Sequence, residues 1–395
     1  MRRIRWAVAI VGSSAVLVSA CGGGTSPASG DGGSSSSSQS SSGATAAGGA
    51  TVASSSTPGS GGAPAAGVLA AGQATAGSFS GRQFSYSGNG GTTQDAQNKI
   101  FGDFATVVGA SYAPDGPPTA AKVKAQVDSG NVTWDIVDAP EVDLAEGCGT
   151  VYQKIDYSKL DTSKLSPLVP KQDCGIALNA SPWTFAYDTE AFPQAPTSWA
   201  DFFDLAKFPG KRAIYAGFPM QQIEIALLGS GVDPGKLAPP DVDAGYAELD
   251  KLKSDLVFYS AGSESQQMMA SNQIVACICW SGRVYTEIQN GSHWALVPTA
   301  PPVLRMDYLA IPIGSKNTDV AYAAINYFIG AQQQAYWQEA TGYPPMNVDA
   351  KPKLSAAAKA VDVFQPPFKP VTIDVTFWAG DLAAQMDKWT TWTSS

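Results

Sequence analysis

Histidine, charged residues and catalytic motifs are scarce in this chain. Among its 395 residues there is one histidine, His293, and charged residues make up only 15%. No Cys-x-x-Cys, HExxH or GxSxG pattern occurs, and no glycine-rich nucleotide-binding motif. Most enzymes that work near neutral pH use histidine as a general base, and His293, next to Trp294, is expected to be an ordinary loop or strand residue. The sequence therefore predicts neither an enzyme nor a cofactor or metal site.

Acidic residues outnumber basic ones, and three of the basic residues lie at the N-terminus. Residues 1–21, MRRIRWAVAIVGSSAVLVSAC, join arginines at positions 2, 3 and 5 to an apolar run too short to span a bilayer, which is typical of an export signal. The ending Val-Ser-Ala-Cys resembles a bacterial lipobox, so we predict lipidation of Cys21, with an ordinary signal peptide as the alternative.

The rest of the chain is strongly acidic. Without the three N-terminal arginines, 22 of the 25 basic residues remain against 34 acidic ones, a formal charge of −12. Nucleic acids and anionic lipids both require basic surfaces. We therefore expect no nucleic-acid partner, and contact with a membrane only through the lipid anchor.

Cysteine is rare as well, at five residues. Export implies an oxidising compartment, in which Cys148 and Cys174, both in loop-like sequence, are predicted to form a disulfide. Cys277 and Cys279 alternate in QIVACICW and therefore share one face of a strand. Because neighbours at i and i+2 bridge poorly, buried free thiols are expected at these two positions.

The chain divides into a low-complexity part and a patterned part. Residues 22–77 are almost entirely Gly, Ser, Ala and Thr, which cannot bury enough apolar surface to fold, so they are predicted to form a disordered tether. Residues 78–395 alternate between strand and helix patterns, and their opening strand–helix–strand order favours a mainly parallel sheet. The predicted strands include 82–88, 134–139, 273–280 and 305–314, and the predicted helices include 94–109, 121–130, 197–210 and 319–340.

Six segments, in order along the chain, resemble those of one protein family. They are YSGNGGTTQDAQ, NVTWDIVDAP, PTSWADFFDLAKFPGKRAIY, CWSGRV, MDYLAIPIGSKN and GYPPMN. From Phe84 to about Ala350 the chain is similar to the solute-binding proteins of bacterial ATP-driven (ABC) importers, in the branch that resembles spermidine/putrescine-binding proteins. The resemblance implies an α/β fold of the type II periplasmic-binding-protein kind, in which two lobes with mainly parallel sheets close on a solute.

The resemblance also implies how the chain is divided. Lobe 1 is expected to comprise about 78–183 and 308–345, and lobe 2 about 184–307, within a solute-binding domain of 78–395. Hinge crossovers are expected near Trp183–Asp188 and Arg305–Leu309. Residues 346–395 are expected to be helical, and no lobe is assigned to them.

Three residues of the ligand site follow from the resemblance. Asp307 matches an acid that holds an amine in polyamine-binding members, and Trp280 and Tyr343 match rings that cover the methylene chain of the ligand. Cation–π contacts of this kind contribute about 0.5–2 kcal/mol each. Four other residues lie at strand ends or beside polar residues and are candidates for the same cleft, with core packing or a tight turn as the alternatives: Asp138, Trp183, Asn89 and Tyr308.

Two departures from the polyamine-binding pattern bear on the ligand. Position 283, often acidic in those members, is Arg283, and the loop SGNGG (87–91) lacks an acid that they can carry. A diamine needs negative charge at both ends, because an unpaired ammonium is costly to desolvate. One acid and one arginine suit a ligand with an amine at one end and a carboxylate at the other, provided that Arg283 faces the cleft rather than a surface acid.

The leading hypothesis is a lipid-anchored protein of the periplasm or cell envelope, monomeric, that binds a small amine and delivers it to an ABC permease. The amine is a polyamine such as putrescine or spermidine, or an ω-amino acid such as γ-aminobutyrate. A binding protein for a carboxylate or phosphonate is the first alternative, favoured if Arg283 and backbone amides line the cleft without Asp307. A secreted enzyme on the same fold is the second alternative, disfavoured by the scarcity of catalytic side chains.

Overall fold

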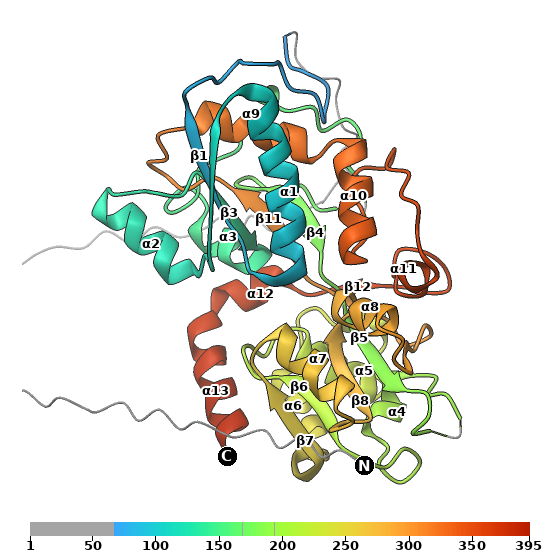
Figure 1. Ribbon diagram of the computed structural model, residues 1–395. Coiled ribbons are helices and arrows are strands. Elements are labelled where there is room, and N and C mark those ends of the chain that lie inside the picture. Colours follow the sequence, from blue (N-terminus) through green and yellow to red (C-terminus); the bar gives the residue numbers. More distant parts are fainter. Residues whose placement is uncertain (1–66, 168, 193) are drawn as a thin grey trace, which may run out of the picture. The chain divides into compact units, whose positions relative to one another are not determined.

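The computed structural model describes residues 67–167, 169–192 and 194–395. The predicted signal peptide, Cys21 and most of the predicted tether lie outside these residues. Within them the strands form two separate sheets, each flanked by helices (Figure 1). The part built on the first sheet is here called lobe 1, and the part built on the second is called lobe 2. No helix in this portion of the chain is long and apolar enough to cross a membrane.

Lobe 1 contains a five-stranded sheet in the order β2-β1-β3-β11-β4. β1 is parallel to β2 and β3, whereas β11 runs antiparallel to β3 and β4. The strands are β1 (Gln83–Ser87), β2 (Ser111–Asp115), β3 (Ile136–Pro140), β4 (Ile176–Ala180) and β11 (Met306–Ala310). The helices are α1 (Gly91–Val108), α2 (Ala120–Ser129), α3 (Glu141–Gly147), the short 3₁₀ helix η1 (Tyr157–Lys159), α9 (Thr318–Phe328) and α10 (Ala331–Thr341).

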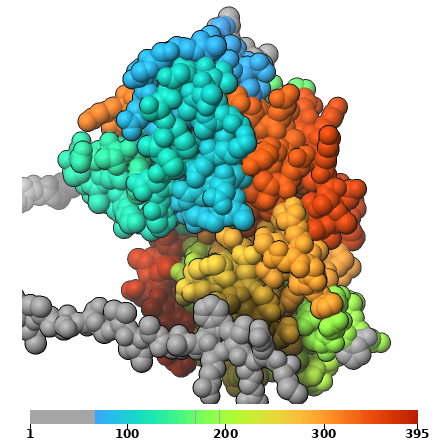
Figure 2. Space-filling model, in the orientation of Figure 1, coloured from blue at the N-terminus to red at the C-terminus, as the bar shows by residue number. Residues whose placement is uncertain are grey.

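Helix α1 covers one face of this sheet because its apolar residues recur at helical spacing. Ile100 and Phe104 are buried, and the ring of Phe104 meets Phe84 of β1 edge-on with centroids 5.6 Å apart. The helix begins after Gly90 (φ 81°) and ends at Gly109 (φ 74°), conformations that glycine adopts without strain. On the surface, α1 adjoins α10 (Figure 2).

Lobe 2 contains a seven-stranded sheet in the order β12-β10-β5-β8-β6-β7, with β9 also paired to β5. β5 runs antiparallel to its three neighbours, whereas β6 is parallel to β7 and β8. The strands are β5 (Trp183–Asp188), β6 (Arg212–Tyr215), β7 (Leu256–Tyr259), β8 (Ala276–Trp280), β9 (Trp294–Leu296), β10 (Val303–Leu304) and β12 (Val371–Thr372). The helices are α4 (Trp199–Phe203), α5 (Gln222–Gly229), η2 (Pro234–Lys236), α6 (Val242–Asp250), η3 (Lys253–Asp255), α7 (Gly262–Ala270) and α8 (Ser281–Gln289).

The predicted α/β architecture with two lobes is confirmed, and both sheets are mixed rather than mainly parallel. The antiparallel strands are those by which the chain enters a new lobe. β5 follows β4 of lobe 1 and runs against the strands of lobe 2, and β11 follows β10 of lobe 2 and runs against the strands of lobe 1.

The two crossovers lie beside each other, at or next to the predicted hinge ranges. The chain passes from β4 to β5 at Ser181–Pro182 and from β10 to β11 at Arg305. The amide nitrogen of Ser181 donates a hydrogen bond to the carbonyl oxygen of Arg305, at 2.8 Å. The predicted range Trp183–Asp188 begins directly after the first crossover and forms strand β5. The predicted range Arg305–Leu309 begins at the second crossover and continues as strand β11.

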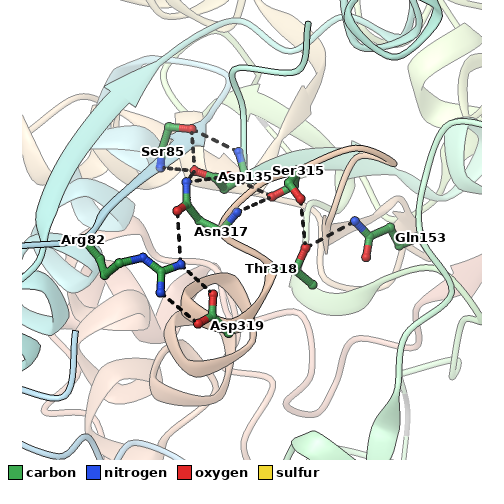
Figure 3. A network of polar contacts seen from close by, with 8 residues as sticks. All are labelled: Arg82, Ser85, Asp135, Gln153, Ser315, Asn317, Thr318 and Asp319. Atoms are coloured by element: carbon green, nitrogen blue, oxygen red, sulfur yellow. Dashed lines mark hydrogen bonds and ion pairs between the residues drawn. The ribbon is translucent and has the colours of Figure 1, made fainter. Parts of the chain in front are cut away.

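A buried polar network fixes lobe 1 at the start of β3 (Figure 3). Asp135 accepts hydrogen bonds from the backbone nitrogen of Ser85 (3.0 Å), from the hydroxyl of Ser315 (2.7 Å) and from the amide of Asn317 (3.3 Å). These contacts join β1, β3 and the segment between β11 and α9. They hold the start of β3, the strand that carries Asp138 at its centre.

Two predicted boundaries are corrected in lobe 1. The long helix predicted over 319–340 is two helices, α9 and α10, separated at Ile329–Gly330. Gly72 lies so close to Gly330 that a side chain at position 330 would overlap it. Residues 69–77, assigned to the tether by composition, also contact lobe 1, since the amide nitrogen of Ala71 donates to Asp161 Oδ2 at 3.1 Å and that of Gly77 to the carbonyl oxygen of Val107 at 3.0 Å.

The C-terminal segment forms three helices: α11 (Ala356–Ala360), α12 (Val375–Gly380) and α13 (Leu382–Ser394). Trp378 and Trp389 belong to the core of lobe 2. The indole nitrogen of Trp378 donates to Glu224 in α5 at 2.6 Å, and α12 also packs against α3 of lobe 1. This segment therefore contacts both lobes. Burial raises the pKa of Glu224 to about 7.

Two disulfides lie within the described residues. Cys148 and Cys174 are bonded, with Cα atoms 5.5 Å apart. The prediction of free thiols at Cys277 and Cys279 was wrong, because these residues of β8 are bonded to each other. Their side chains share one face of the strand and their Cα atoms are 5.4 Å apart, inside the range of about 4.4–6.8 Å that a disulfide spans.

Replacement of both Cys148 and Cys174 by alanine is predicted to lower the free energy of unfolding by roughly 3.5 kcal/mol, since the bond closes a loop with a sequence separation of 26. Urea unfolding of the oxidised wild type and the double variant measures this difference. Mass spectrometry of unreduced peptides provides the control, and two free thiols at these positions in freshly purified protein would contradict the assignment.

Candidate functional site

The candidate site lies where β3 and β11 of lobe 1 end near the crossovers. In the antiparallel register of these strands, Asp307 is opposite Pro140 and Leu309 is opposite Asp138. Helix α3 begins at Glu141, directly after β3. The topology thus brings acids that are far apart in the sequence to one edge of the sheet.

Asp307 is buried and both of its carboxylate oxygens have partners. Oδ2 accepts a hydrogen bond from the hydroxyl of Ser181 at 2.5 Å, and Oδ1 lies 3.2 Å from Nε of Arg305. The sequence predicted Asp307 as an acid for a ligand amine. In this structure the carboxylate is instead already paired with a guanidinium of the same chain.

Asp138 differs from Asp307 because its Oδ1 has no hydrogen-bond partner within the described residues. Burial, followed by repulsion from Asp307, raises its pKa well above the usual range, although Arg305 and the side chains of Asn89 and Gln97 oppose the shift. A carboxyl group in this condition ionises readily only when a further positive charge arrives.

Two more acids, both in α3, lie near the same guanidinium. Burial raises the pKa of Glu141 to about 8 and that of Asp143 to about 6, and Arg305 opposes both shifts. Glu141 Oε1 has no hydrogen-bond partner in the described part of the chain. The acidic groups near Arg305 therefore outnumber the one guanidinium that lies among them.

Arg305 is the functional residue that the sequence analysis missed. Burial would lower its pKa, but Asp307 and the neighbouring acids outweigh this effect and raise it. Its guanidinium carbon lies 4.9 Å from the ring centre of Phe218 in lobe 2. The signal was available, because Arg305 and Asp307 are two residues apart and alternate residues of an extended chain share a face.

Lobe 2 contributes an aromatic wall. Trp280 at the end of β8 lies 4.1 Å from Trp183, measured between ring centroids, and 5.1 Å from Tyr215. Phe218 lies 4.7 Å from Tyr215 and 5.9 Å from Trp183. Trp280 packs against core residues of both lobes, so the wall stands at their junction.

Tyr343 lies between the acidic and basic parts of the site. Burial raises its pKa to about 12, and its hydroxyl is within electrostatic reach of Arg283, Asp307 and Arg305. Its ring reaches helix α8, where a Cβ atom at Gly282 would lie 2.6 Å from Tyr343 Cζ. Glycine at position 282 thus permits the close approach of this ring.

Arg283 of α8 points towards the start of α1 in lobe 1. A Cβ atom at Gly91 would lie 3.3 Å from Nη1 of Arg283, and Nη1 donates to Gln266 at a long 3.4 Å. Nε of Arg283 is buried and has no hydrogen-bond partner within the described residues. The start of an 18-residue helix and a guanidinium, both positive, therefore converge, an arrangement that suits an anion.

Several buried polar atoms around this site have no hydrogen-bond partner among the residues that the structure describes. They come from both lobes and include donors and acceptors: the hydroxyls of Tyr86, Ser87 and Ser281, Oε1 of Gln97, Oδ1 of Asp138, Nε1 of Trp183 and Nε of Arg283. An unsatisfied buried polar group costs about 1–3 kcal/mol. A concentration of such groups is typical of a site whose polar partners arrive with a ligand.

The structure does not bring every predicted residue to this site. Tyr308 is fully buried in a core cluster of lobe 1, and its hydroxyl donates to the carbonyl oxygen of Pro170 at 3.2 Å. Asn89 is exposed at the edge, near Asp138. His293 lies on the surface of lobe 2, 3.3 Å from Glu190.

Beside Arg305 is a cavity of about 70 Å³. It is lined by residues of both lobes: Pro140, Glu141, Val142, Asp143, Phe218, Met220, Gln221 and Arg305. Within the described residues, no group of three His, Cys, Asp or Glu side chains is arranged to hold a metal ion. Together these residues form a site with a negative end, an aromatic wall and a separate positive end.

The chain is similar to known solute-binding proteins. A model of the family described as bacterial extracellular solute-binding protein matches residues 91–363. The chain is 31% identical over 234 residues to the gamma-aminobutyric acid-binding protein of Pseudomonas aeruginosa, which covers 58% of this chain and 66% of the relative. It is 32% identical over 181 residues to spermidine/putrescine-binding periplasmic protein 1 of Haemophilus influenzae, covering 46% of this chain and 47% of the relative.

These matches span between about half and two thirds of the length of the curated relatives. Among solved structures, the Atu4243 GABA receptor is similar with a TM-score of 0.74 and 33% sequence identity. That similarity covers 79% of this chain and 98% of the receptor chain. The likeness therefore extends over both lobes.

The raised pKa of Glu141 predicts a pH dependence of stability. The folded state binds a proton up to about pH 8, whereas the usual pKa is 4.5, so the contribution of Glu141 is full below about pH 4.5 and is lost as the pH rises through about 8. Between pH 5 and pH 8 this decline is about 3.5 kcal/mol, and the Glu141→Gln variant should lack it. Urea unfolding of ligand-free protein at pH 5 and pH 8 measures it.

The exposed Glu146 in the same helix provides the matched control. Glu146→Gln should retain the wild-type pH dependence. Equal slopes for the wild type and Glu141→Gln would contradict a buried, protonated Glu141.

Proposed function

The chain belongs to the family of bacterial extracellular solute-binding proteins, and we propose that it binds a small ω-amino acid, γ-aminobutyrate or a close analogue, and delivers it to an ABC permease. Members of this family bind solutes and are not enzymes, which disfavours the alternative of a secreted enzyme. The observation that carries the proposal is the separation of charge in the site. Unsatisfied acids lie at one end, and an arginine without a carboxylate partner lies at the other, within the described residues.

In this proposal the ligand ammonium binds at Asp138. Its Oδ1 has no hydrogen-bond partner among the described residues, and its raised pKa would fall when a positive charge binds beside it. Charge-assisted hydrogen bonds of this kind are stronger than neutral ones. Asp307, the acid predicted from the sequence, adds to the negative potential although it is already paired with Arg305. Trp280 and Tyr343 cover the methylene chain.

The ligand carboxylate binds Arg283 and the amino end of α1. Nε of Arg283 is buried without a partner in the described part of the chain, and its guanidinium lies against Gly91 at the start of that helix. Support for this placement comes from the contacts of Arg283, which reaches Gly91 of the neighbouring lobe and has no acidic partner among the described residues. An unpaired arginine at this position disfavours a ligand with ammonium groups at both ends.

A diamine or polyamine is the second candidate, favoured by the four acids Asp138, Glu141, Asp143 and Asp307. It is also the ligand named for the Haemophilus influenzae relative. Against it stand two arginines, Arg283 and Arg305, that would repel a second ammonium. A carboxylate or phosphonate without an amine is less suitable because it leaves the acids without a counter-charge.

Calorimetry with γ-aminobutyrate, putrescine and spermidine tests the proposal. The wild type should bind γ-aminobutyrate most tightly, and Arg283→Ala should weaken this binding by about 2–5 kcal/mol, the range for truncating one partner of a buried charge pair. Asp138→Asn should weaken it more than Asp307→Asn, because Arg305 already neutralises Asp307.

The control is Arg82→Ala, which removes an exposed arginine that pairs with Asp319 on lobe 1. It should leave all three affinities unchanged. Heat from the two polyamines alone would overturn the ω-amino acid proposal, and no binding of any of the three would overturn the amine-binding role.

We propose further that the protein is held at the cell envelope by a lipid on Cys21. The support is the sequence, in which a basic and apolar start ends in Val-Ser-Ala-Cys and is followed by a Gly/Ser-rich segment. The tether between the anchor and the domain would be shorter than predicted, because residues 69–77 contact lobe 1. The site itself would then remain free to bind the solute.

The Cys21→Ala variant is predicted to lose incorporation of radiolabelled palmitate, and a chain lacking residues 1–66 should be soluble and retain ligand binding. Radiolabelling and gel mobility report the lipid, cell fractionation reports solubility, and calorimetry reports ligand binding. A Cys21→Ala protein that stays membrane-bound at unchanged size would show that Cys21 is not the anchor.

A further inference from the structure

The guanidinium of Arg305 occupies surroundings that resemble a binding site for a ligand ammonium. It pairs with Asp307, lies over the ring of Phe218 and has Asp138, Glu141 and Asp143 as electrostatic neighbours. Carboxylates and an aromatic face are the groups that proteins use to hold organic cations. The chain therefore supplies one cation to this acidic cluster by itself.

The position of Arg305 is fixed by the crossover from which it extends. Its carbonyl oxygen accepts a hydrogen bond from the amide nitrogen of Ser181 in the other crossover, and the hydroxyl of Ser181 holds the second oxygen of Asp307. Only 17% of the Arg305 side chain is exposed. The guanidinium is thus anchored within the site rather than free to leave it.

We infer that Arg305 is a specificity-determining residue, an internal counter-charge that occupies the place of a second ligand ammonium. With Asp307 engaged, Asp138 is the acid with a free oxygen, and the site accepts one ammonium. The guanidinium lines the cavity beside it together with Glu141 and Asp143, so a second ammonium that entered this cavity would lie next to the positive charge of Arg305. The inference rests on the proposed amine-binding function and explains how the site excludes diamines.

Removal of the charge should convert the site towards diamines. Two like charges about 4 Å apart repel strongly near a protein surface. Removal of the Arg305 charge should therefore raise the affinity for a diamine at least about tenfold. In Arg305→Gln and Arg305→Met, the ratio of the putrescine Kd to the γ-aminobutyrate Kd should therefore fall at least about tenfold. Glutamine retains a donor for Asp307, and methionine retains packing on Phe218.

Two controls accompany these variants. Arg305→Lys keeps the charge but loses the planar guanidinium over Phe218, so its ratio should lie closer to that of the wild type than the ratios of the two uncharged variants do. Arg82→Gln removes an exposed arginine on lobe 1 and should leave the ratio unchanged. Isothermal titration calorimetry gives both dissociation constants, and thermal unfolding reports whether each variant folds.

The outcomes are distinct. An unchanged ratio in both variants, or a wild type that binds putrescine as tightly as γ-aminobutyrate, would overturn the inference while amine binding stands. Loss of γ-aminobutyrate without a gain for putrescine would instead assign Arg305 to the ligand carboxylate, and failure of both variants to fold would assign it a structural role. A wild type that binds neither ligand would refute the proposed function itself.

Discussion

Carboxylates from which water is excluded need positive charge beside them, and this requirement governs the junction of the two lobes. Asp138, Glu141 and Asp143 gather with Asp307 around the guanidinium of Arg305. Burial raises the pKa values of the first three above their usual range, and the single guanidinium opposes these shifts without cancelling them. In the proposed function, a ligand ammonium would supply the missing charge, and ligand binding would then be coupled to the ionisation of these acids.

The fold produces this charge arrangement through its crossovers. β5 and β11 are the strands by which the chain enters a new lobe, and the residues next to them, Ser181 and Arg305, are joined by a hydrogen bond. Asp307 and Arg305 therefore sit where the lobes meet, and the Asp135 network holds β3 so that Asp138 lies beside them. Trp280 and Arg283, at the end of β8 and the start of α8, complete the site from lobe 2.

Much of this arrangement could be predicted from the sequence, because it depends on local patterns. Alternating strand and helix patterns predicted the α/β class. The departure at Arg283 favoured a ligand with an amine at one end and a carboxylate at the other, with polyamines left open, and this stays a prediction. The pairing of Asp307 with Arg305 could be read from their spacing, but the hydrogen bond from Ser181 to Asp307 could not be predicted, since these two residues are 126 positions apart. The break between α9 and α10 likewise depends on Gly72, which packs on Gly330 from a segment that composition assigned to a tether. The Cys277–Cys279 bond could not be predicted from the i and i+2 spacing, because it depends on how closely the two Cα atoms approach in β8, here 5.4 Å.

The central claim is that the site has a polarity, with its acidic end at Asp138 and its basic end at Arg283. A crystal structure of the complex with γ-aminobutyrate tests it most directly. The account predicts the ammonium nitrogen within hydrogen-bonding distance of Asp138 and the carboxylate beside Arg283 and the start of α1, with Arg305 still paired to Asp307. A ligand bound in the opposite direction, or with its carboxylate on Arg305, would contradict the account.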